Sequence, residues 1–234
     1  MNRTEPVFED RQLYRIDGKN CFFEINRAFD LGDGKLNLFF VQYDPLQGNR
    51  QTAKVSAYLD VAEFLYLANA ILCGELKAVA DKMKAAGSNH ALYENLGGTS
   101  AKRLEASHRA REDGKSESRR FTISLGTKSD FYVSAESGPG EESATGLIVP
   151  LYGKSSKPAE VRIGLPVSNK EMQKMALIVD RYIGAWFNRV EMQKPADDAA
   201  QQLREKIEKE IETAQSPSQD YIRGLQRAIE LTAR

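Results

Sequence analysis

Apolar and polar side chains alternate along residues 35–43 and 54–59 of this chain, and the alternation predicts two β-strands. Between them, Asp44–Pro45 and Gln47–Gly48–Asn49 are typical of a chain reversal, because proline presets φ and glycine or asparagine tolerates positive φ. A hairpin with one apolar face is therefore predicted. The side chains expected on that face are Leu36, Leu38, Phe40, Val55, Ala57 and Leu59.

A helical pattern begins at Val61, directly after the second strand. Asp60 stands at the expected N-cap and Glu63 follows three residues later, which is the spacing of a capping box. Apolar residues then cover more than half of the helix circumference, so this helix is expected to pack on both a sheet and a second helix. The helical pattern continues to about Ala86.

The residues before the hairpin complete a first structural unit. Residues 20–29 alternate as a strand, and residues 13–16 are a candidate for a short additional strand. A meander of at least three strands followed by a helix is therefore predicted for residues 13–86.

Residues 119–192 show the same order of elements, although sequence identity between the two units is weak. Ser168 is expected to open an apolar helix, with Glu171 at the capping-box position. The predicted fold is α+β, with two antiparallel sheets, each followed by a long helix, and the two helices packed together as a pseudo-dimer. The predicted strands are 119–125, 131–135, 146–152 and 159–165, with Gly138–Pro139–Gly140 as a turn.

Two further segments lie outside these units. Residues 87–118 lack a clear apolar period and are expected to form a connector, in which Gly97–Gly98 is a turn. Residues 193–234 are expected to form a C-terminal helical tail, with Pro195 ending the repeat region. The apolar stripe of the last helix predicts that the tail docks on the body of the protein, on a second copy or on a partner protein.

Composition narrows the class of protein. The chain has 234 residues, of which 41% are hydrophobic and 28% charged, and this is typical of a folded domain rather than of a disordered chain. No apolar run is long enough to cross a membrane and the N-terminus lacks a signal-peptide pattern, so no membrane association and a cytoplasmic location are expected. Two cysteines without metal-ligand spacing, Cys21 and Cys73, are expected to be buried thiols.

The stretch GKLNLFFVQYDPLQGNRQTAKVSAYLDVAEF, residues 34–64, has a strand, a YDP turn, a basic strand and an Asp-capped apolar helix. This order resembles the positive cofactor four transcriptional coactivators and the Whirly proteins, which bind single-stranded DNA. The resemblance covers residues 20–76 and, more loosely, 119–190. It implies that two sheet-and-helix units pair through their helices, as a fused Whirly-like pseudo-dimer, and that curved sheets hold unpaired strands of DNA.

The outward faces of the predicted sheets combine aromatic and basic side chains. Aromatic rings stack on unpaired bases, and cations neutralise phosphates, so this combination favours single-stranded DNA or RNA as the partner. An alternative is that the aromatics are ordinary cross-strand pairs or lie beneath the C-terminal helices, which would make the protein an interaction or oligomerisation module. The candidate nucleic-acid-binding residues are Lys35, Phe39, Tyr43, Arg50, Lys54, Tyr58, Arg120, Tyr132, Tyr152 and Arg162.

Other chemistry has little support in the sequence. His90 and His108 lack metal-ligand spacing, and no nucleophile and base arrangement is recognisable, so we expect no metal, no cofactor and no catalysis. The formal net charge is zero, so a polyanion must be bound by a local basic patch. The basic run in residues 102–120 could form such a patch, but we favour its interpretation as a solvated loop over a contact site.

Overall fold

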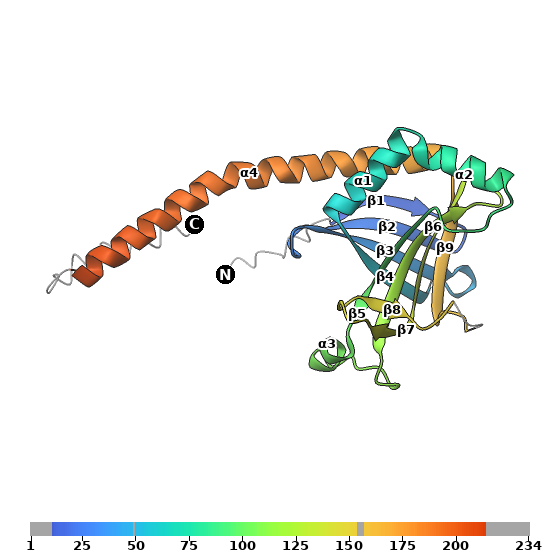
Figure 1. The fold of residues 1–234 in the computed structure, drawn as a ribbon, viewed down its shortest axis with the longest axis horizontal. Coiled ribbons are helices and arrows are strands. Elements are labelled where there is room, and N and C mark those ends of the chain that lie inside the picture. Colours follow the sequence, from blue (N-terminus) through green and yellow to red (C-terminus); the bar gives the residue numbers. More distant parts are fainter. Residues whose placement is uncertain (1–10, 49, 154–156, 214–234) are drawn as a thin grey trace. The chain divides into compact units, whose positions relative to one another are not determined.

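The structure is a computed structural model that describes residues 11–48, 50–153 and 157–213. It has an α+β fold with two antiparallel sheets and a long C-terminal helix. Figure 1 shows α1 and α2 near one end of the sheets and α3 near the opposite end. The α+β class and the two antiparallel sheets were predicted from the alternation pattern.

The first sheet is a four-stranded meander with the order β1-β2-β3-β4. The apolar face predicted for β3 and β4 is confirmed, because Leu36, Leu38, Phe40, Val55, Ala57 and Leu59 are each at most 4% exposed. The candidate strand at residues 13–16 is also present, as part of β1. The strands are β1 Gln12–Asp17, β2 Cys21–Ala28, β3 Lys35–Asp44 and β4 Arg50–Asp60, with a 3-10 turn, η1, at Pro45–Gln47.

The second sheet has five strands. Its long strands pair in the order β5-β6-β7-β9, and the short β8 pairs with the far end of β7. The strands are β5 Tyr93–Thr99, β6 Ser116–Leu125, β7 Phe131–Glu142, β8 Ile148–Pro150 and β9 Val161–Val167. The segment 87–118, expected to be a connector, therefore contributes an edge strand to the sheet, together with the short helix α3, Ala101–Ala106.

The two glycine-rich segments predicted to be turns lie inside strands, so both turn predictions are wrong. Gly98 lies in β5, where a Cβ atom would come within 2.3 Å of the Glu117 carbonyl oxygen and 2.9 Å of Ile148. Gly140 lies in β7, where a Cβ would come within 2.7 Å of Ile148. Glycine is therefore needed at both positions, because the Ile148 side chain of β8 lies against each of them and the Glu117 carbonyl of β6 lies against Gly98.

The core lies between the two sheets. Phe23 of β2 and Phe40 of β3 stack with ring centroids 4.4 Å apart, and Phe121 of β6 lies 6.2 Å from each ring. All three side chains are at most 3% exposed. Burial of this apolar area is the main term that holds the sheets together.

The first helical segment is divided into α1, Val61–Leu72, and α2, Glu75–Ala85. The helix starts where it was predicted, after Asp60, but the capping-box hydrogen bond is absent. The Asp60 carboxylate instead accepts a hydrogen bond from Lys35 Nζ at 2.5 Å. The break between the helices occurs at Gly74, whose φ of +82° is accessible to glycine and strained for other residues.

The last helix, α4, spans Asn169–Thr213. It begins as predicted, because Ser168 Oγ accepts a hydrogen bond from the Glu171 backbone N–H at 3.2 Å. The prediction that Pro195 ends this element is wrong, since α4 continues through it. A proline costs about 3 kcal/mol within a helix, and the alanine, glutamine, glutamate and lysine residues around it favour the helix strongly enough to offset that cost.

Two apolar residues of α4 have a different environment from the one expected. Ile178 and Tyr182, expected to pack on the first helix, are 39% and 49% exposed. Neither of these two side chains is therefore buried in a contact between helices. The prediction that the tail docks on another surface falls on residues 214–234, which lie outside the described residues.

Candidate nucleic-acid interface

An aromatic cluster lies on the outer face of the first sheet. The Phe22 ring centroid is 6.4 Å from that of Phe39 and 6.5 Å from that of Tyr43, and all three rings are partly exposed. Val41 also belongs to this face by alternation from Phe39, but Val41 is only 5% exposed. Phe22 and Lys54 are its cross-strand neighbours, and their side chains help to cover it.

Two basic residues on this face differ in whether they are neutralised. Arg15 lies over the Phe22 ring at 3.8 Å, and its guanidinium forms ion pairs with Asp17 at 2.7 Å and Glu24 at 2.8 Å. Lys54 is exposed and forms no ion pair within the described part of the chain. Lys54 is therefore the cation on this face that remains available to an anionic ligand.

Tyr58 continues the same face of β4 to the edge of the sheet. Lys54, Ser56 and Tyr58 alternate with buried residues and so point to one side. The Tyr58 side chain is 42% exposed, and its residue pairs across the strands with Asn37 of β3. Arg50, at the beginning of β4, is also exposed.

A groove of about 700 Å³ begins at this edge, between β4 of the first sheet and β5 of the second. Lys35, Tyr58 and Asp60 line one side, and β5 residues Asn95–Thr99 line the other. Four basic side chains line the groove against a single carboxylate, that of Asp60. It is a region of strong positive charge on a chain with no net charge.

Three of these basic residues were not among the predicted site residues. Arg103 belongs to α3, Arg109 follows it, and Arg119 belongs to β6. The signal in the sequence was the basic run in residues 102–120, for which a solvated loop was favoured over a contact site. Lys35 and Tyr58 are the predicted residues that the structure brings to the groove.

The basic residues predicted on the second sheet lie in a different electrostatic environment. Arg120, Glu136 and Arg162 are cross-strand neighbours on β6, β7 and β9. Glu136 is 7% exposed, and its carboxylate accepts hydrogen bonds from Arg120 and lies 3.3 Å from Arg162 Nε. Both arginines are therefore held in ion pairs with Glu136, whose single carboxylate offsets one of their two positive charges.

The two tyrosines predicted on the second sheet lie against glycines. Tyr152 is 2% exposed, and a Cβ atom at Gly138 would come within 3.0 Å of its ring. Burial raises the pKa of its phenol, and the ring is not accessible for base stacking. Tyr132 is half-buried, and its ring covers Gly164 of the adjacent strand.

Within the described ranges, no three His, Cys, Asp or Glu residues are close enough to hold a metal ion, and no helix is long and apolar enough to cross a membrane. Cys21 is buried as predicted, whereas Cys73 is exposed.

Comparison with protein-family models, curated proteins and solved structures found no match to this chain. The function of this chain is therefore inferred from the residues of the site.

Proposed function

We propose that this protein binds single-stranded nucleic acid, with DNA as the expected polymer, in the cytoplasm and without catalysing a reaction. The observation that carries the proposal is the partly exposed aromatic face of the first sheet. This face includes Phe39 and Tyr43, and it ends with Tyr58 beside a positively charged groove. RNA is the alternative polymer.

This arrangement suits unpaired rather than paired bases. A base in a duplex is already stacked on its neighbours, whereas an unpaired base gains about 1 to 3 kcal/mol by stacking on a protein aromatic ring. Lys54 and the basic groove supply cations for the phosphates, and that part of the affinity falls as salt rises. The expected ligand is a flexible single strand whose bases reach the sheet.

We also propose that the two units form a Whirly-like pseudo-dimer within one chain. The order of elements supports this proposal, because β1-β2-β3-β4 is followed by α1 and β5-β6-β7-β9 is followed by α4. Each unit is thus a four-stranded meander with a helix after its last strand. The beginning of the second unit lies at β5, within the segment expected to be the connector.

The decisive experiment is titration of labelled oligonucleotides with the whole protein at two salt concentrations. We expect binding to oligothymidylate that weakens at higher salt, and weaker binding to a duplex of the same length. A duplex control separates base stacking from simple attraction to phosphate, since both ligands carry phosphates but only the single strand offers free base faces. Absence of binding to single strands at low salt would contradict the proposal.

The helices support a second candidate function, that of an interaction or self-association module. Tyr66 of α1 and Val79 of α2 are 72% and 40% exposed, and Leu177 of α4 is 47% exposed. Exposed apolar side chains indicate a protein contact where they form one continuous patch, and the second candidate requires that these three do so. Sedimentation velocity over a range of protein concentrations tests this, and a monomer at every concentration would exclude self-association.

A further inference from the structure

We infer that the groove between β4 and β5 binds successive phosphates of the single strand, so that the strand passes from the face of the first sheet to the edge of the second. This inference rests on the proposed function and assigns a binding site to residues outside the predicted set. The residues that carry it are Arg103, Arg109 and Gly97.

The first observation is unused positive charge. Arg119 is held by Glu117 at 2.6 Å and Thr99 at 3.2 Å, and Lys35 is held by Asp60. Among the residues described, Arg103 forms no ion pair, and the only hydrogen bond of the Arg109 side chain is the one it donates to Ser107 Oγ, at 3.3 Å. Two guanidinium groups in the groove therefore remain available, and guanidinium matches phosphate geometry well.

The second observation is an unexplained glycine. Glycine weakens a strand, and it is often found where another backbone or a ligand approaches closely. At the neighbouring Gly98, glycine is required because a Cβ atom would clash with Glu117 and with Ile148 of β8. Gly97 also lines the groove, yet a Cβ atom there would meet nothing within 4 Å, and its φ is not positive. Packing within the described chain does not require this glycine, whereas a ligand lying against the backbone of β5 would.

The third observation is the position of β5 at the edge of its sheet. An edge strand has a row of backbone N–H and C=O groups without partners in the sheet. With no side chain at Gly97, a phosphate can approach the N–H groups of this edge. The groove volume of about 700 Å³ lies within the usual range for ligand sites.

The face of β4 leads directly to the groove. Lys54 and Tyr58 share one face of this strand, and Tyr58 lines the mouth of the groove. A base stacked on Tyr58 would place its phosphates beside the guanidinium groups. This combination favours a nucleic acid over an acidic peptide, which would use the cations but not the exposed ring.

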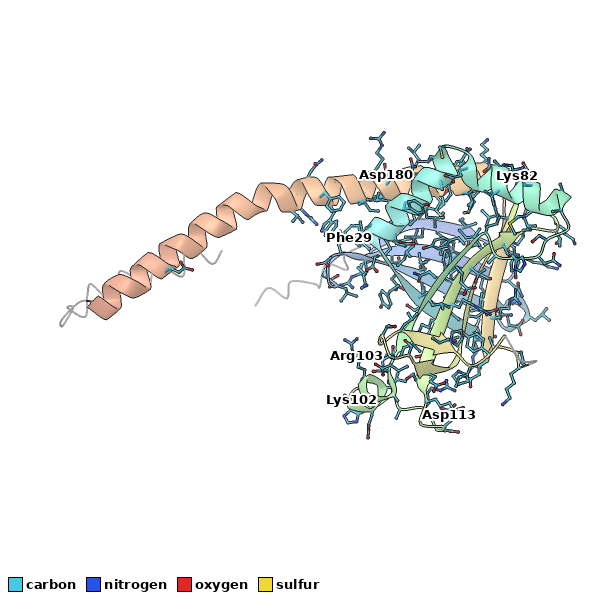
Figure 2. All side chains as sticks on the ribbon, viewed as in Figure 1. Phe29, Lys82, Lys102, Arg103, Asp113 and Asp180 are labelled. Carbon is cyan, nitrogen blue, oxygen red and sulfur yellow. The ribbon has the colours of Figure 1, made fainter. Side chains whose placement is uncertain are left out.

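The experiment compares Arg103→Gln/Arg109→Gln with Lys102→Gln in the full chain. Lys102 is exposed on the same helix as Arg103 but does not line the groove, so Lys102→Gln controls for the loss of one nearby surface charge (Lys102 and Arg103 are labelled in Figure 2). The probe is a labelled oligothymidylate of about 16 nucleotides, which is long enough for one binding site. In about 0.1 M salt the double variant should bind about 25-fold more weakly, and the slope of log affinity against log salt should fall by about 1.4.

A second variant tests the site without changing charge. The Cβ of Gly97→Leu has free space and the fold should be retained, which thermal unfolding checks, while the side chain would occupy the space beside the backbone of β5 and remove most of the affinity. Wild-type protein that binds no oligonucleotide would refute the proposed function. Wild-type binding with equal affinity for the arginine double variant, Lys102→Gln and Gly97→Leu would refute the groove alone. Displacement of the oligonucleotide by polyglutamate as effectively as by oligothymidylate would overturn the choice of nucleic acid.

Discussion

Lys54 on β4 of the first sheet and Arg162 on β9 of the second are both exposed on the outer face of an edge strand, but their neighbours differ. Lys54 has no ion-pair partner in the part of the chain that the structure covers. Arg162 shares the Glu136 carboxylate with Arg120. The outer face of the first sheet therefore has a cation available for a ligand, whereas the cations of the second sheet are used within the protein.

The position of the acidic residue accounts for this difference. Each face has a glutamate on a central strand, Glu24 on β2 and Glu136 on β7. Glu24 pairs with Arg15 on β1, away from the exposed end of β4. Glu136 lies directly between two arginines in the cross-strand register. The same residue types thus produce an open face or a compensated one, depending on which residues the register places opposite each other.

The largest effect is expected on stability, from Glu136→Ala. This change leaves the partly buried Arg120 without its partner and should lower the free energy of unfolding by about 2 to 3 kcal/mol, somewhat below the cost for a fully buried pair. Glu24→Ala is the matched change on the first sheet, where Arg15 is more exposed, and it should cost less than about 1 kcal/mol. Urea unfolding measures both, and equal costs would remove the contrast between the faces.

The next effect concerns ligand binding. Replacing Phe39 or Tyr58 by Ala should weaken oligonucleotide binding by about 1 to 3 kcal/mol each, because a stacking ring is lost. Tyr132→Ala is the control on the second sheet and should change binding little. Circular dichroism establishes whether each variant is folded. A folded Tyr58→Ala protein with wild-type affinity would show that the first sheet is no more available to bases than the second.

A smaller effect on stability is expected at β1, the other edge of the first sheet, where Tyr14 is hydrogen-bonded to Glu171. Tyr14 of β1 donates a hydrogen bond to Glu171 Oε1 at 2.5 Å, which lowers the pKa of that carboxyl group. Tyr14→Phe should therefore cost about 1 kcal/mol at neutral pH, since Glu171 is partly exposed.

The dependence of this cost on pH follows from the direction of the pKa shift. A lowered carboxyl pKa in the folded state stabilises the protein above the ordinary value of about 4.3, and the contribution is lost as pH falls through the lowered pKa. The stability difference between wild type and Tyr14→Phe should consequently shrink in acid. Urea unfolding at a series of pH values measures it, and a constant difference would show that the hydrogen bond to the carboxylate is not its source.

The smallest expected effect is electrostatic. Lys54→Gln should reduce the slope of log affinity against log salt by about 0.7, because one fewer counterion-releasing phosphate contact is made. Arg162→Gln should leave the slope nearly unchanged, because this arginine is paired with Glu136. Titrations at several salt concentrations give both slopes. A larger change for Arg162→Gln would place the ligand on the second sheet instead.

The sequence by itself determined the strands β3 and β4, their buried faces, and the starts of α1 and α4. These features depend on interactions between near neighbours in the chain. A period of two residues distinguishes the two faces of a strand, and the turn or capping residue lies within a few positions of the element it begins or ends. Lys35, Tyr58 and Lys54 were identified as candidate ligand contacts by the same local pattern.

Only the tertiary structure decided the role of the glycines, of Tyr152 and of the arginines. The local sequence around Gly98 and Gly140 predicts turns, whereas in the structure the Ile148 side chain of β8 lies against both glycines. Arg120 was predicted to contact phosphate, but the strand register places it beside Glu136. Arg103 lines a groove because the edges of β4 and β5 meet. Each of these outcomes depends on segments far apart in the chain coming together, and a pattern read along one segment does not contain that information.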